Sequence, residues 1–161
     1  MAVGRAVSWL TLFMVLATCT VVLLRRGFDQ GSIALQESVT YMHAAVFMLG
    51  AAYALKRDAQ VRVDIFYRQF SRRTKAWVNS LGALVLLLPL SIFTGVISWD
   101  FVMDSWRIYE GSTDSGGLKG VFLLKSLLPL TALMLTLQGV ASVLHNLLIL
   151  MDVAGPEDAA S

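Results

Sequence analysis

Four long apolar stretches, separated by short polar connectors, constrain this chain more than any other feature of its sequence. The hydrocarbon core of a bilayer is about 30 Å thick, so about 20 apolar residues are enough for one helical span. In lipid, only helices and closed β-barrels pair all their backbone N–H and C=O groups by hydrogen bonds. The stretches are continuously apolar rather than alternating, which favours helices over barrel strands. We therefore predict one all-α transmembrane domain over residues 1–161, with spans near residues 6–24, 33–55, 76–103 and 121–151.

Composition leaves little of the chain outside the membrane. Hydrophobic residues make up 57% of the 161 residues and charged residues 15%, whereas a soluble domain carries about 25% charged residues. The net charge of +2 comes from basic residues beside the apolar stretches rather than on a solvated face, so we predict no nucleic-acid binding. Such a chain acts within the bilayer or through partners, and membrane lipids are among those partners.

The basic residues are concentrated in the connector between the second and third stretches. Short cytoplasmic loops are enriched in Lys and Arg. With four spans, this connector lies on the same side as both termini, and that side holds eight basic residues, Arg5 included, against four on the other side. We therefore predict a multi-pass protein with both termini in the cytoplasm.

The same connector carries an amphipathic pattern. On a helical wheel its aromatic side chains share one narrow face while its basic residues point elsewhere, which predicts a helix at the membrane interface over residues 61–73. The alternative is a helical extension of the third span into the cytoplasm. Each basic residue would favour anionic headgroups by about 1 kcal/mol. The candidate anchoring residues are Val63, Phe66, Tyr67, Phe70, Arg72, Arg73 and Trp77.

Glu37 is the main candidate for a functional ionisable residue, because charged groups inside a membrane are rare and usually functional. It lies about one helical turn into the second span, near the outer interface, where water reaches it. This position favours a contact between helices or subunits. Proton carriage by Glu37 is the alternative.

Two histidines raise the question of a haem held between helices. His43 lies about 10 residues below the outer end of its span, and His145 about 24 residues below the outer end of the fourth span. At about 1.5 Å per residue, their depths differ by roughly 20 Å. We therefore predict no haem and no other cofactor, and expect His43 to form a hydrogen bond between helices.

Small residues in the spans predict close helix packing. Gly50 and Ala54 are spaced i, i+4, with Ala51 beside them, and Gly139 lies in the fourth span. The sequence has no Gly-rich phosphate loop, no metal-ligand spacing and no nucleophile beside a base. It also lacks the inverted repeat of transporter cores. These observations predict neither an enzyme nor a self-sufficient transport core.

Two sequence blocks resemble the small membrane subunit, of the DctQ-like type, of tripartite ATP-independent periplasmic (TRAP) transporters. The first block has an acidic residue at the start of the span, a small-residue triplet, a basic pair and a final valine-aspartate. The second has a Gly-Gly-Leu sequence before the fourth span. The matching residues are Glu37, Gly50-Ala51-Ala52, Lys56-Arg57, Val63-Asp64, Ser115-Gly116-Gly117-Leu118, Lys125, Pro129 and Leu137-Gln138-Gly139. The chain departs from the family pattern at Gln60, where the family often has His, and at Lys119, where it often has Pro.

This resemblance implies an accessory permease subunit in the bacterial inner membrane. TRAP systems import organic acids and related solutes with a sodium gradient. A periplasmic solute-binding protein delivers the solute to a large membrane subunit, which the small subunit contacts as a heterodimer and scaffolds in the bilayer. The residues expected at helix-packing or subunit contacts are Glu37, His43, Gly50, Ala51, Ala54 and Gly139. The residues expected in a loop that faces the binding protein are Asp104, Arg107, Glu110 and Lys119.

A second hypothesis comes from a different functional class. The chain would be a self-contained, proton-coupled small exporter that acts as a homodimer, with Glu37 as its proton carrier. The acidic residue within a span is its main support.

Overall fold

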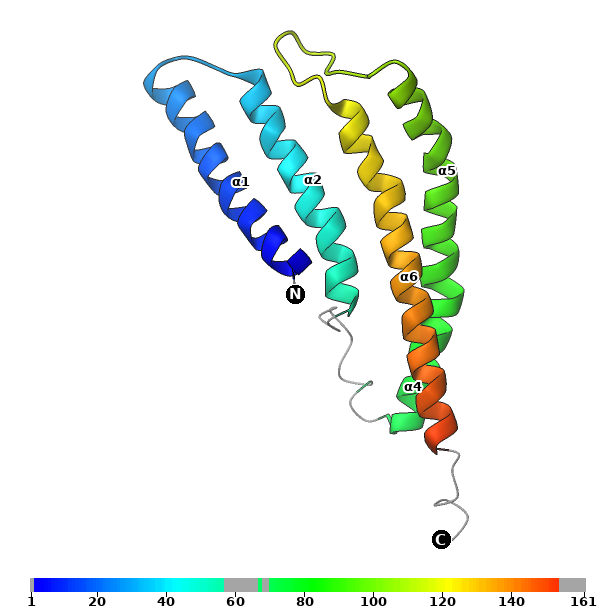
Figure 1. The fold of residues 1–161 in the computed structure, drawn as a ribbon. Coiled ribbons are helices and arrows are strands. Elements are labelled where there is room, and N and C mark those ends of the chain that lie inside the picture. The colour runs from blue at the N-terminus through cyan, green and yellow to red at the C-terminus, as the bar shows by residue number, and fades with distance from the viewer. Residues whose placement is uncertain (1, 57–66, 68–69, 154–161) are drawn as a thin grey trace, which may run out of the picture.

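The computed structural model describes residues 2–56, 67 and 70–153, and these form helices and loops without a strand (Figure 1). Four helical segments are long and apolar enough to cross a membrane, so the predicted all-α fold with four potential spans is confirmed. The elements are α1 (Ala2–Gly27), α2 (Ile33–Lys56), α4 (Arg72–Gly82), η1 (Ala83–Leu87), α5 (Leu88–Arg107) and α6 (Val121–Val153). The candidate spans are Ser8–Gly27, Ile33–Leu55, Arg72–Arg107 and Val121–Met151.

The helices form an open layer rather than a closed bundle. Helix α1 packs on α2, α2 packs on α6, and α6 packs on α4, η1 and α5 (Figure 1). Helix α1 begins at the same end of the layer at which α6 ends, while the loop between α5 and α6 lies at the opposite end. Because each helix has few neighbours, the buried hydrophobic side chains among the described residues are small ones: Ala52, Ala76, Ala83, Val102 and Ala132.

The third span is built from three consecutive elements. Ser71 caps the start of α4, since its hydroxyl accepts a hydrogen bond from the backbone N–H of Thr74 at 3.2 Å. The π turn η1 ends two residues before Pro89, which lies in the first turn of α5. Proline lacks an N–H, and its ring clashes with the carbonyl four residues earlier. A wider turn at that point relieves the clash while the helix continues.

The predicted interfacial helix, residues 61–73, lies mostly outside the described residues, and so do its anchors Val63 and Phe66. Arg72 and Arg73 belong to the first turn of α4, which continues into the third span. The Tyr67 hydroxyl accepts a hydrogen bond from Asn79 Nδ2 at 2.8 Å. This contact links the end of the connector to the side of α4.

The contact between α5 and α6 is lined by small side chains. Gly95 lies so close to α6 that a Cβ atom on it would be 3.3 Å from the Cβ of Ala132. Near this point Thr136 Oγ1 donates a hydrogen bond to Ser91 Oγ at 2.9 Å. Small residues allow backbones to approach closely, and hydroxyl pairs add specificity inside a membrane. This contact forms the closely packed side of the layer.

Candidate functional site

The loop that joins α5 to α6, residues 108–120, is a folded element. The Ser112 N–H donates to the Leu118 carbonyl at 2.9 Å, and the Gly117 N–H donates to the Asp114 carbonyl at 3.0 Å. Gly116 has a φ of 85°, which residues with a Cβ rarely adopt. These bonds bring the two ends of the loop together, as in compact loops that carry function.

Glu37 connects this loop to α2. Its carboxylate accepts hydrogen bonds from the Ser112 hydroxyl and from the Leu118 N–H, the latter at 2.6 Å. Such bonds to an ionised acceptor are stronger than neutral ones. A Cβ on Gly117 would lie 2.8 Å from Glu37 Oε1 and would overlap the Ser112 side chain. Only glycine therefore fits between the loop and this carboxylate.

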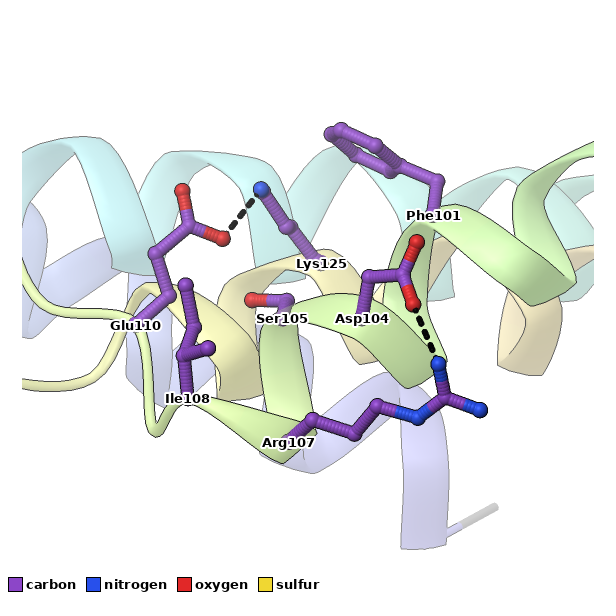
Figure 2. A pocket seen from close by; sticks show the side chains of 7 residues that line it. All are labelled: Phe101, Asp104, Ser105, Arg107, Ile108, Glu110 and Lys125. Atoms are coloured by element: carbon purple, nitrogen blue, oxygen red, sulfur yellow. Dashed lines mark hydrogen bonds and ion pairs between the residues drawn. The ribbon is translucent and has the colours of Figure 1, made fainter.

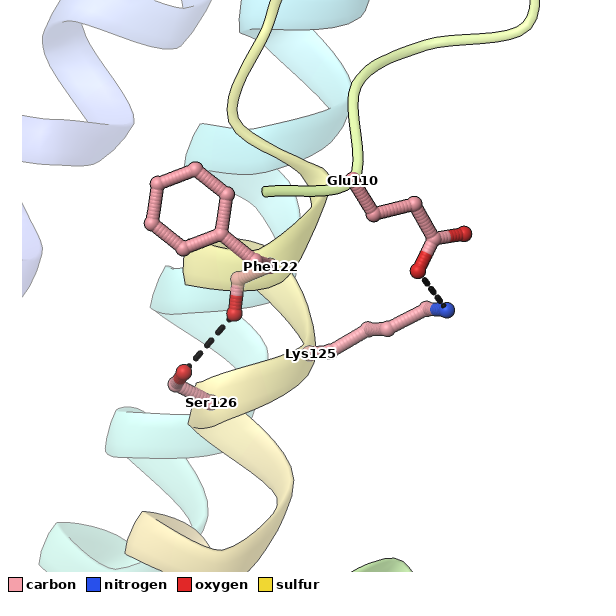
Figure 3. A network of polar contacts seen from close by, with 4 residues as sticks. All are labelled: Glu110, Phe122, Lys125 and Ser126. Carbon is pink, nitrogen blue, oxygen red and sulfur yellow. Dashed lines mark hydrogen bonds and ion pairs between the residues drawn. The ribbon is translucent and has the colours of Figure 1, made fainter. Parts of the chain in front are cut away.

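A second polar contact ties the beginning of the loop to α6. Lys125 Nζ donates to the Glu110 carboxylate (Figure 3). Lys125 Nζ also lies 4.0 Å from the centre of the Phe101 ring. The Lys125 bond lowers the pKa of Glu110, and the nearby Ser105 hydroxyl lowers this pKa further. The Ser105 hydroxyl faces the carboxylate without the geometry of a full hydrogen bond. Glu110 is therefore held as a carboxylate at neutral pH.

Aromatic side chains support the same end of the layer. The Phe122 ring meets the Trp106 and Tyr109 rings edge to face, with centroid distances of 4.8 Å and 5.7 Å. Trp106 Nε1 donates to Ser126 Oγ at 2.8 Å, and the Ser126 hydroxyl donates to the Phe122 carbonyl at 2.7 Å (Figure 3). The loop, α5 and α6 therefore form one connected unit.

A shallow pocket of about 440 Å³ opens between the loop and the end of α5 (Figure 2). Its charged side chains pair with one another, because Arg107 contacts Asp104 at 3.0 Å and Lys125 contacts Glu110. The pocket therefore presents balanced charge rather than a free cation or anion. Among the described residues, no group of three or more His, Cys, Asp or Glu side chains could hold a metal ion.

The structure brings together some of the predicted site residues and separates others. Glu37 and Glu110 each contact a group on another element, whereas Asp104, Arg107 and Lys119 are exposed. On α2, His43 and Ala51 are exposed, while Gly50 and Ala54 are half-buried. Gly139 is buried against the Leu87 and Leu88 side chains.

Sequence reasoning missed the loop partners of Glu37. Ser112 and the Leu118 N–H lie 75 and 81 residues away from it along the chain. The usable signal was the Gly116–Gly117 pair, since adjacent glycines mark positions where the backbone turns or approaches another group closely.

Acidification is expected to weaken the contact between Glu110 and Lys125 only when the pH falls below the ordinary pKa of a glutamate carboxyl group. The folded protein lowers the pKa of Glu110, so its stabilisation is fully present above the unfolded-state value of about 4.5 and is lost as the pH falls through the lower folded-state pKa. Thermal unfolding in detergent at decreasing pH measures this effect, with Glu110→Gln as the control. Identical acid profiles for the two proteins would show that the contact contributes nothing.

A protein-family model described as "Tripartite ATP-independent periplasmic transporters, DctQ component" matches residues 14–148. The matched segment includes the four span helices, in part or whole, and the whole of the loop just described. No curated protein and no solved structure matches the chain.

Proposed function

Because the chain belongs to the DctQ family and is a small membrane subunit of a TRAP transporter, we propose that it scaffolds the large membrane subunit of that transporter. The transport is the sodium-driven uptake of an organic acid or related solute, which a periplasmic binding protein delivers. Family membership favours this proposal over a self-contained proton-coupled exporter. The protein acts as a partner in transport and not as an enzyme.

The open helical layer is the observation that carries this proposal. Large hydrophobic side chains are exposed on all the spans, including Phe13 of α1, Phe47 of α2, Phe93 of α5 and Leu137 of α6. A layer of this kind leaves wide apolar faces that lipid or a larger membrane protein can cover. A scaffold needs such surface.

We place the protein in the bacterial inner membrane with both termini in the cytoplasm, following the distribution of Lys and Arg. In this orientation the α5–α6 loop faces the periplasm. The exposed charges beside it, those of Asp104 and Arg107 in the last turn of α5, and that of Lys119 within the loop are then available to the binding protein. The contacts that Glu37 and Glu110 make fix the conformation of the loop, and therefore of this surface.

Affinity purification of the tagged chain, co-expressed with the large membrane subunit of its own transporter, tests the proposal. We expect recovery of the large subunit in stoichiometric amount, and loss of solute uptake in cells that lack this chain. Recovery of this chain alone as a homo-oligomer, together with unchanged uptake in its absence, would contradict the scaffolding function.

Reversing the charges of Arg107 and Lys119 together, to Glu, is expected to reduce uptake when the binding protein is limiting. Arg107 and its partner Asp104 are both exposed, and surface ion pairs contribute at most about 1 kcal/mol. Folding and recovery of the large subunit should therefore be unchanged. Added salt should diminish the difference from the unmodified protein, because it screens electrostatic steering. Unchanged uptake at low salt would show that these charges do not contribute to docking of the binding protein.

A further inference from the structure

Helix α2 exposes one stripe along its length, and the first half of this stripe is polar. Between Ala34 and Leu55 the exposed residues occur at intervals of three or four, which places them on one helical face. The other residues of this stretch are buried or half-buried. The exposed residues are Gln36, Thr40, His43, Phe47 and Ala51, and we call them the α2 stripe.

Contact of the polar residues of this stripe with lipid tails would be energetically unfavourable. His43 lies ten residues beyond Ile33, the start of α2, which is about 15 Å and close to the middle of the bilayer core. Within the described part of the chain, the side chains of Gln36, Thr40 and His43 form no hydrogen bond. A polar group in hydrocarbon without a hydrogen bond is strongly unfavourable, so such residues normally face protein or water.

Other exposed threonines in the spans behave differently. The hydroxyls of Thr18, Thr20 and Thr94 each donate to the carbonyl four residues earlier at 2.8 Å. The hydroxyls of these threonines are hydrogen-bonded within their own helix, so these side chains can face lipid. The Thr40 hydroxyl makes no such bond within the described residues, which leaves it available to another chain.

The exposed face of α6 provides a second contrast. Most of its exposed side chains are apolar, among them Leu130, Leu133, Leu137, Leu144 and Leu148. Its exposed histidine, His145, lies near the end of the helix rather than near the middle of the span. Lipid tails accept such a face without loss. Polarity near the middle of the span therefore distinguishes the α2 stripe from the α6 face, although both are exposed in the isolated chain.

We propose that the α2 stripe is the surface on which the large TRAP membrane subunit binds, through hydrogen bonds to Thr40 and His43. This inference rests on the proposed function. The partner must span the membrane and present hydrogen-bonding groups at the depth of His43. Phe47 is 71% exposed and inserts into the partner as an aromatic anchor, while the small Ala51 allows close approach of a partner helix.

Photo-crosslinking tests the position of the partner. Benzoylphenylalanine replaces Phe47 in one variant and Phe93, which is 62% exposed on α5, in the control. Both variants are expressed with the large subunit and irradiated in native membranes. We expect a covalent adduct with the large subunit from position 47 in clear excess over position 93. Adducts only with a second copy of this chain, no protein adduct, or equal yields from both positions would overturn the assignment.

Substitution of His43 tests the chemistry of the contact. We expect His43→Leu to lower recovery of the large subunit about three- to tenfold, the range for one lost interhelical hydrogen bond, and His43→Gln to retain most of it. Unchanged recovery with higher thermal stability for His43→Leu would show that the stripe faces lipid. If the unmodified chain recovered no large subunit, the proposed function itself would be contradicted, together with the occupant named for this stripe.

Discussion

Replacing Gly139 with leucine is expected to force α6 away from the junction of η1 and α5 and to destabilise the protein by about 3 kcal/mol or more. A Cβ on Gly139 would lie 2.9 Å from Leu88 Cδ2 and 3.1 Å from Leu87 Cδ2. Overpacking of this kind usually destabilises by about 1–3 kcal/mol, and here a whole branched side chain has no space. Thermal unfolding in detergent measures the loss.

Two variants control for the loss of glycine itself. Gly139→Ala should have a much smaller effect, because the atoms nearest its Cβ are the flexible ends of leucine side chains. Gly82→Leu introduces the same side chain where nothing lies within 4 Å. We expect it to be neutral or to stabilise the helix by about 0.5–1 kcal/mol. Equal destabilisation by leucine at both positions would contradict the close packing at Gly139.

The helical spans were predictable because continuous apolar character is sufficient to specify them. Residues 33–55 and 121–151 were expected as spans from this property, and the structure has apolar helices over the same stretches. The third span runs over Arg72–Arg107, beyond the expected residues 76–103 at both ends. Polar residues of α4 continue the helix because Ser71 caps it and Tyr67 contacts its side, and neither contact alters the hydropathy of the sequence.

The contacts between the spans were less predictable. Glu37 was expected at a contact, but its partners in the α5–α6 loop are distant in sequence and are brought to it only by packing of α2 on α6. The orientation of His43 could not be read from the sequence either. Helix α2 is apolar on nearly all sides, so its periodicity does not indicate which face its neighbours cover.

Glu37→Ala is expected to release the α5–α6 loop and to reduce solute uptake to background. The substitution removes the acceptor of two bonds, from the Ser112 hydroxyl and the Leu118 N–H, and leaves both donors without their charged partner. Lys119 follows the second donor directly, so loosening of the loop should make cleavage by trypsin at Lys119 faster in the purified protein. Uptake in cells and the rate of this cleavage are the two measurements.

Glu37→Gln separates this structural function from proton carriage. Glutamine has the same length and keeps one acceptor oxygen, so it can retain one of the two bonds to the loop, and we expect intermediate cleavage and partial uptake. Ser112→Ala, which removes one donor and keeps the carboxylate, should behave similarly. A proton carrier predicts the opposite combination, in which Glu37→Gln abolishes transport while cleavage stays slow and Ser112→Ala transports normally. Because the two mechanisms differ in both measurements, a loss of uptake caused by misfolding cannot be mistaken for a loss of proton transfer.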